Sequence, residues 1–158
     1  MKIKMVLLSL VMVMTAGMAS AQLSDRLEGL QPLTLEYAGF EFQVPPGANV
    51  VRDSKMTVTY PNQTLFGMSL VNQVVRGSNQ KRAYEMCERY ARDFELKNWK
   101  VEKVTVAGSK GAKAYGEQEG AIVTILILPT NDNELTMVIM ADPSNQGLTE
   151  GVISSMKR

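Results

Sequence analysis

The sequence contains no histidine, a single cysteine and few aromatic residues, which make up 6% of its 158 positions. The lack of histidine excludes Ser-His-Asp and Cys-His nucleophiles and imidazole zinc sites. General acid-base catalysis near neutral pH would need carboxylates or lysines with strongly shifted pKa values. We find no catalytic, metal-binding or cofactor-binding motif, so the sequence favours a protein that is not an enzyme and carries no cofactor.

An excess of charge of one sign is also lacking, because 17 Lys and Arg residues stand against 16 Asp and Glu residues. Sequence-independent nucleic-acid binding depends on a basic face that releases counterions, and the lysines are not clustered in this way. We therefore expect no nucleic-acid partner. With 45% apolar and 21% charged residues, the composition is typical of a compact globular domain rather than of a disordered chain.

Residues 1–21 have the pattern of a secretory signal peptide. Two lysines precede the apolar run at residues 5–14, and small residues precede a cleavage site after Ala21. A membrane-spanning helix needs ~20 apolar residues, and this run is shorter. Gln22 stands where a bacterial lipoprotein has a cysteine, so we expect no lipid anchor. The sequence therefore predicts a periplasmic or secreted protein without a membrane span.

The segment after the cleavage site, residues 22–32, has three leucines at spacings of four and three among charged residues. This pattern predicts either a short amphipathic helix or a mobile arm. No linker, internal repeat or low-complexity tract interrupts the remainder. We therefore expect residues 33–158 to form one domain.

Alternation of apolar and polar residues predicts two β-hairpins in the first half of the chain. Residues 33–37 and 40–44 alternate, and Ala38-Gly39 between them is a two-residue connection. Residues 56–60 alternate in the same way, and the period of two resumes at residues 66–70 after a turn.

The period changes to that of a helix over residues 78–96, where apolar side chains share one face and Glu-Arg pairs lie four residues apart. Ser78 or Asn79 is expected to cap the start of this helix, and Asn98 to terminate it.

Two later segments, residues 121–128 and 135–141, are apolar on both faces. A strand of this kind has to be covered on both faces, so we expect these two to be central strands. Further strands are expected at residues 101–107 and 112–117, joined by a turn at residues 108–111.

A closing helix is predicted near the end of the chain, because Leu148, Val152, Ile153 and Met156 share one face. This helix can cover one side of the central strands while helix 78–96 covers the other. The sequence therefore predicts an α+β fold, a three-layer α/β/α sandwich on a mainly antiparallel sheet.

Three segments resemble binding motifs but are better explained as turns or as a helix start. Residues 108–113 lack the glycine spacing and the following helix of a phosphate loop. Residues 142–147 imitate the first half of a calcium loop, but Ile153 stands where the closing glutamate belongs, so Asp142 is interpreted as part of a helix start. The polar segment at residues 131–134 is interpreted as a hairpin tip.

Two single residues were weighed as functional candidates. Cys87 lies on the apolar face of helix 78–96, with no basic residue on that face to lower its pKa, so we interpret it as a core residue rather than a nucleophile. Trp99 follows the helix directly. It is interpreted as cover for the junction between helix and strand rather than as an anchor for a partner.

The order of these features is distinctive. A leading hairpin contains Phe40-x-Phe42-x-Val44-Pro45, a second hairpin and one long helix follow, and the chain closes with a helix at Val152-Ile153-Ser154-Ser155-Met156-Lys157. Over about residues 33–157 this layout resembles the PsbP-like fold, named for an extrinsic subunit of photosystem II and found also in small bacterial exported proteins. Members of that fold are mostly non-enzymatic accessory or binding modules, and the resemblance implies the same role here. No site residue is carried over, because no site motif matches.

Two functional hypotheses follow. The first is an exported, non-enzymatic accessory or binding protein of the bacterial cell envelope, whose partner is another envelope or secreted protein. The alternative is a small carrier of an apolar ligand, in which Met68, Met137 and Met140 line a pocket between sheet and helix, since methionine suits adaptable sites. A hydrolase built on lysine and serine or on two carboxylates finds no support in the residue spacing.

Overall fold

The computed structural model describes residues 31–61, 66–143 and 147–158. The predicted signal peptide and nearly all of the predicted arm at residues 22–32 lie outside the described residues. Within the described parts of the chain, no helix is long and apolar enough to cross a membrane.

Two helices and nine strands follow one another along the described chain. They are β1 (Leu33–Tyr37), β2 (Phe40–Val44), β3 (Asn49–Arg52), β4 (Met56–Thr59), β5 (Gly67–Val74), α3 (Gln80–Asp93), β6 (Lys97–Val106), β7 (Ser109–Gln118), β8 (Ala121–Asn131), β9 (Glu134–Asp142) and α4 (Leu148–Ser155).

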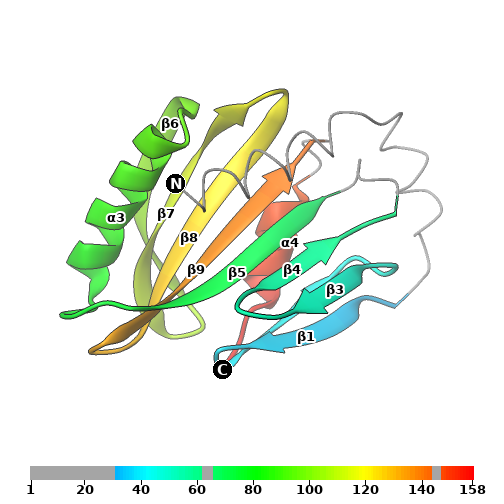
Figure 1. The fold of residues 1–158 in the computed structure, drawn as a ribbon, viewed down its shortest axis with the longest axis horizontal. Coiled ribbons are helices and arrows are strands. Elements are labelled where there is room, and N and C mark those ends of the chain that lie inside the picture. The colour runs from blue at the N-terminus through cyan, green and yellow to red at the C-terminus, as the bar shows by residue number, and fades with distance from the viewer. Residues whose placement is uncertain (1–30, 62–65, 144–146) are drawn as a thin grey trace.

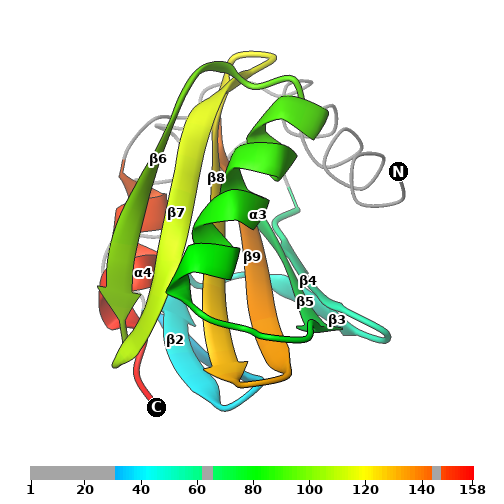
Figure 2. The ribbon, with the colours of Figure 1, turned by 90° about the vertical axis from the view of Figure 1, so that its left-hand side faces the viewer.

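Seven of the strands form one antiparallel sheet in the order β3-β4-β5-β9-β8-β7-β6. The two strands that are apolar on both faces, β8 and β9, therefore lie in the middle of the sheet, as predicted. Helix α3 packs on one face, against β6, β7 and β8 (Figures 1 and 2). The prediction of an α+β fold with a mainly antiparallel sheet is confirmed.

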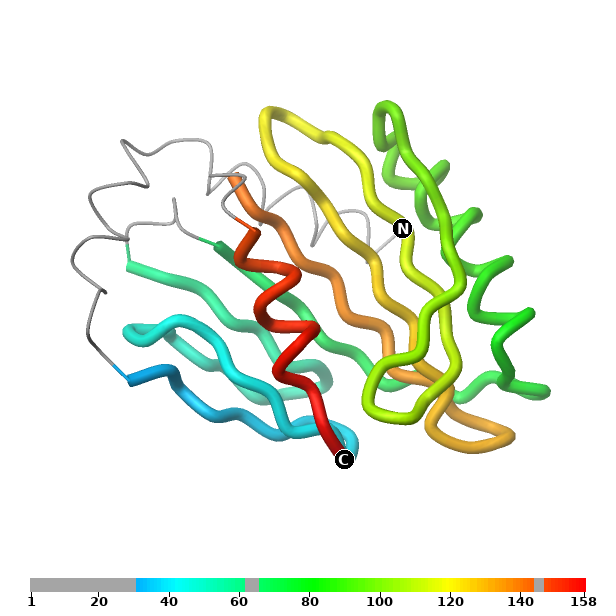
Figure 3. The backbone as a smooth tube through the Cα atoms, turned by 180° about the vertical axis from the view of Figure 1, so that it is seen from behind, coloured from blue at the N-terminus to red at the C-terminus, as the bar shows by residue number. Residues whose placement is uncertain are grey.

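The opposite face is covered by α4 together with the β1-β2 hairpin, which forms a separate two-stranded sheet (Figure 3). From the sequence we expected the closing helix alone on this face, and the hairpin is an addition to that layer. The hairpin and the end of the chain are joined directly, because backbone hydrogen bonds of 2.8 and 2.9 Å link Glu41 to Lys157. The Ser155 hydroxyl accepts a further bond from the Gln43 amide at 2.8 Å.

The β1-β2 turn lies where the sequence predicts it, with Ala38 and Gly39 at φ 51° and 82°. Both values suit the tight two-residue turn that matches strand twist. The next turn was predicted at residues 108–111. This position is wrong, because the turn lies at Ala107 and Gly108, with φ 51° and 78°. Gly111 belongs to β7, and a Cβ atom there would collide with the carbonyl oxygen of Ile127, so this glycine serves close strand packing.

The first helix is shorter than the predicted segment 78–96. Asn79 caps α3, since its side-chain oxygen accepts a 2.8 Å hydrogen bond from the Arg82 amide, as predicted. The helix ends at Phe94 rather than at Asn98, because the next residue, Glu95, has a left-handed backbone with φ 56°.

Buried apolar side chains form two clusters separated by the sheet. The cluster beneath α3 includes Cys87, Ile125 and Met137, all with 3% exposure or less. The cluster beneath α4 and the hairpin includes Phe42 and Met140, both fully buried. Each central strand contributes alternate residues to the two clusters, which accounts for its unbroken apolar sequence.

Candidate functional site

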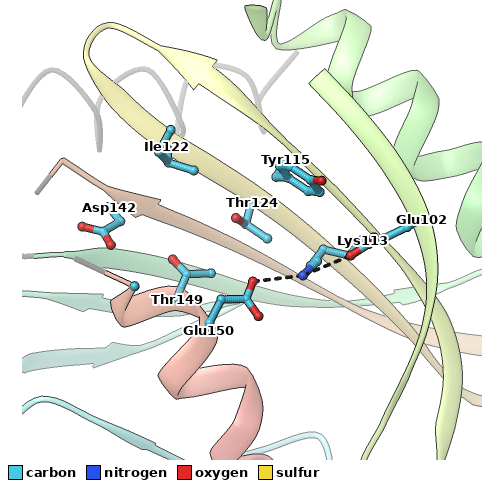
Figure 4. A pocket seen from close by; sticks show the side chains of 9 residues that line it. Glu102, Lys113, Tyr115, Ile122, Thr124, Asp142, Thr149 and Glu150 are labelled. Carbon is cyan, nitrogen blue, oxygen red and sulfur yellow. Dashed lines mark hydrogen bonds and ion pairs between the residues drawn. The ribbon is translucent and has the colours of Figure 1, made fainter. Parts of the chain in front are cut away.

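A cleft of about 270 Å³ opens on the α4 face of the sheet, beside the first turn of α4 (Figure 4). Most of its lining residues have polar or charged side chains, unlike the residues of the apolar clusters beside it. The lining residues are Glu102, Lys113, Tyr115, Ile122, Thr124, Asp142, Gly147, Thr149 and Glu150.

The strand residues of the cleft share one face of the sheet because side chains alternate along a strand. Cross-strand pairing then makes them neighbours: Glu102 pairs with Lys113, and Tyr115 pairs with Thr124. Asp142, at the end of β9, pairs with Ile122, which lies two residues before Thr124 on the same face of β8. Three antiparallel pairings therefore bring together residues that are far apart in sequence.

Lys113 lies at the centre of the charges in the cleft. Its Nζ atom is 2.9 Å from Oε1 of Glu150 and 3.3 Å from Oε1 of Glu102, and its side chain is 12% exposed. Burial lowers the pKa of Lys113, but the hydrogen bonds and charges of Glu150 and Glu102 outweigh burial and raise this pKa above its ordinary value. The ammonium group stays protonated at neutral pH and cannot act as a general base or a nucleophile.

Asp142 connects the cleft to the start of α4. Its side chain is buried at 3% exposure, and Oδ2 accepts a 3.3 Å hydrogen bond from the Leu148 amide. This contact agrees with its interpretation as part of a helix start. The rest of the loop that imitates a calcium site, residues 144–146, lies outside the described residues, and among those described no group of three or more Cys, Asp or Glu residues is placed to hold a metal.

Two threonine hydroxyls lie in the lining of the cleft. Thr124 is 3% exposed and Thr149 is 6% exposed. The Thr149 hydroxyl has no hydrogen-bond partner among the described residues, although buried polar groups are nearly always paired.

Cys87 lies in the core beneath α3, as predicted, with its Sγ atom 3.6 Å from the Ile125 carbonyl oxygen. Burial raises the pKa of its thiol to about 12, which keeps it in the unreactive protonated form. Trp99 is partly buried beside α3, with the Arg92 guanidinium 5.6 Å from its ring centre, and it covers the junction between helix and strand.

The structure does not bring together the three methionines of the carrier hypothesis. Met68 and Met140 pair across β5 and β9 in the cluster beneath α4, and both are fully buried. Met137 belongs to the other cluster, because it lies three residues before Met140 on a strand whose side chains alternate. The expected methionine-lined pocket is therefore wrong, and these side chains fill the core.

The cleft itself was missed by the sequence analysis, although one signal pointed to it. Thr124 interrupts the otherwise apolar run of β8, and a polar residue in a strand covered on both faces needs a partner. The charged residues gave no such signal, since Glu102 and Glu150 meet Lys113 only through tertiary structure.

Neither a protein-family model nor a curated relative matches the sequence. Among solved structures, the chain is similar to cyanobacterial PsbP (CyanoP) from Synechocystis sp. PCC 6803, with a TM-score of 0.58 and 12% identity over 81% of this chain and 94% of that chain. The chain has a PsbP-like fold. The resemblance seen in the sequence is thereby confirmed, at the level of the fold.

Two further solved structures match with lower TM-scores. A protein from Bacteroides thetaiotaomicron matches with a TM-score of 0.48 and 16% identity over 75% of this chain, which spans 44% of the length of that protein. LpqN of Mycobacterium tuberculosis, described as involved in cell envelope biogenesis, matches with a TM-score of 0.49 and 11% identity over 85% of this chain and 95% of that chain.

Proposed function

We propose that this chain is an exported, non-enzymatic accessory protein of the bacterial cell envelope, and that it binds through the polar cleft beside α4. Its partner is another envelope or secreted component. The implication drawn from the sequence resemblance, that of an accessory or binding module, agrees with this role.

The observation that carries the proposal is the state of Lys113. A catalytic lysine needs a lowered pKa, whereas this one is held as an ammonium ion between Glu102 and Glu150. The only cysteine of the sequence is buried away from the cleft, and the chain has no histidine. The cleft therefore offers groups that form hydrogen bonds, and its lysine is held in the protonated form.

Export is tested by the mass and location of the protein in its own host. We expect the protein in the periplasmic or extracellular fraction, with an intact mass that corresponds to loss of residues 1–21. An uncleaved chain confined to the cytoplasmic fraction would contradict the proposal.

Binding through the cleft is tested by crosslinking in intact cells, followed by comparison of variants. The wild type and the control Val74→Thr, at a site that is 83% exposed and outside the cleft, are expected to retain the same envelope component. The cleft variant Glu102→Gln is expected to lose it. Equal retention by all three proteins would remove the cleft from the proposal.

A further inference from the structure

We propose that the cleft binds a small uncharged molecule rich in hydroxyl groups, such as a sugar or another polyol. This inference rests on the proposed function only in taking the cleft as the binding site, and it does not depend on export or on a protein partner.

The charges of the cleft disfavour an anionic ligand. Glu102, Asp142 and Glu150 carry negative charge, and Lys113 is the one basic residue in the lining. Because Lys113 is already paired with two carboxylates, a phosphate or carboxylate ligand would have to compete with them. The field of the cleft would also repel it.

A cationic ligand is disfavoured for a different reason. The position between Glu102 and Glu150, where an ammonium group would be held best, contains the Nζ atom of Lys113. A second cation would lie beside this one and be repelled by it. Each of the two glutamates keeps its other carboxylate oxygen free of Lys113, so acceptors for neutral donors remain.

The groups that remain suit ligand hydroxyls. The Thr149 hydroxyl, which is buried at the wall of the cleft and closed to solvent in this structure, has no partner, and a hydroxyl group both donates and accepts hydrogen bonds. Thr124 places a second, nearly buried hydroxyl in the same lining. A ligand hydroxyl can donate a hydrogen bond to a threonine hydroxyl or accept one from it. A ligand group that only donates or only accepts uses just one of the two bonding modes of the threonine.

The wall of the cleft is partly apolar, because Tyr115 and Ile122 are both partly buried beside these hydroxyls (Figure 4). A sugar ring presents carbon-bound hydrogens as well as hydroxyls, so it can contact this wall while it bonds to the threonines and glutamates. The volume of about 270 Å³ lies just below the range of roughly 300–1,000 Å³ that is typical of small-molecule sites. A ligand of one or two rings therefore fits better than a long chain.

The inference is tested by NMR titration of the protein purified from its host, with glucose, mannose, N-acetylglucosamine and maltose as neutral probes. Glucuronate and glucosamine serve as anionic and cationic probes on a matched ring. We expect at least one neutral probe to shift the backbone amide signals of Thr124 and Thr149, and to bind at least tenfold more tightly than either charged probe. Binding of no neutral probe, or tighter binding of a charged one, overturns the inference.

Variants locate the binding. Thr149→Val and Glu102→Gln are expected to weaken it at least tenfold. Thr130→Val is the matched control, because the Thr130 hydroxyl is also buried and unpaired but lies outside the cleft lining, and it should leave binding unchanged. Equal affinities in all three variants would place the ligand elsewhere. Failure of every sugar, combined with loss of envelope crosslinking in Glu102→Gln, would refute the ligand class and leave the proposed function standing.

Discussion

The two faces of the seven-stranded sheet are covered in different ways. Beneath α3 the sheet presents mainly apolar residues, and the helix covers most of them and buries the thiol of Cys87. On the opposite face, α4 and the β1-β2 hairpin cover an apolar cluster, but β6, β7 and the start of β8 extend beyond them. There the face becomes polar and forms the cleft.

This difference separates residues that stabilise the fold from residues available for binding. A side chain beneath α3 has no solvent to contact, so its chemistry is decided by packing. A side chain in the cleft can keep unused hydrogen-bonding capacity, as that of Thr149 on α4 does. One sheet thus forms core on one face and, on part of the other, the wall of the proposed binding cleft.

The sharpest test compares two isoleucines of the same strand. Ile125 is fully buried beneath α3, whereas Ile122 is partly exposed in the cleft. Ile125→Ala should lower the free energy of unfolding by about 2–5 kcal/mol, because it removes packed atoms and leaves a cavity. Ile122→Ala should cost less than about 1 kcal/mol. Denaturant unfolding measures both, and equal losses would show that the cleft face is as tightly packed as the α3 face.

The sealed face also predicts a pH dependence that comes from Cys87. Its thiol pKa is raised from 9.0 to about 12 by burial, so the folded state resists forming the thiolate that the unfolded chain forms readily. The stabilisation is fully present below pH 9 and is lost as the pH rises toward 12. Between pH 8 and 10 the wild type should lose about 1.4 kcal/mol more stability than Cys87→Ala.

The measurement compares the two proteins in denaturant unfolding at each pH, so that a constant offset from the missing sulfur does not matter. Tyr60, whose pKa is likewise raised by burial, is present in both proteins and cancels. Parallel stability curves for the two proteins would mean that the thiol is open to solvent.

On the cleft face, a charge substitution should have a smaller effect. Lys113→Met leaves Glu102 and Glu150, which are 50% and 63% exposed, without their counterion. We expect a loss of about 0.5–1 kcal/mol at pH 7, since exposed ion pairs contribute little. Unfolding in 1 M salt should reduce the loss, because the screening length falls to about 3 Å. A loss that does not depend on salt would point to packing of the lysine stem instead.

The smallest effect is expected for Thr149→Val. Its hydroxyl forms no hydrogen bond within the described structure, so its removal should change the free energy of unfolding by less than about 0.5 kcal/mol. Thermal or denaturant unfolding tests this directly. A loss of more than about 1 kcal/mol would show that the hydroxyl supports the fold, and would weaken its assignment to a ligand.

The central strands and the first helix could be predicted because each follows from the residue pattern of its own segment. The apolar runs of β8 and β9 require cover on both faces, and the helical period of α3 supplies it on one side. Strand β3 was not predicted, because it is a short edge strand in which only Val50 is partly buried and no alternation appears. Gly111 was interpreted as a turn residue, since its role in close packing depends on a carbonyl from another strand.

The cleft could not be predicted for a related reason. Its charged residues come from three strands and a helix. In sequence, Glu102, Lys113 and Glu150 each have an ordinary explanation as an exposed charge, and Asp142 has one as part of a helix start. Only the pairing of β6 with β7 and the position of α4 place Glu102 and Glu150 on either side of Lys113. Composition does predict the absence of histidine chemistry, which limits what such a cleft can do.

The link between the first hairpin and the C-terminal end of α4 has a consequence for biosynthesis. Gln43 bonds to Ser155, a residue 112 positions later in the chain. Before that late segment is made, the hairpin can contact β5, because the Asn72 amide donates a hydrogen bond to the Tyr37 hydroxyl, but it lacks its bonds to α4 and to Lys157. The contacts that complete this layer of the fold are therefore the last to be synthesised.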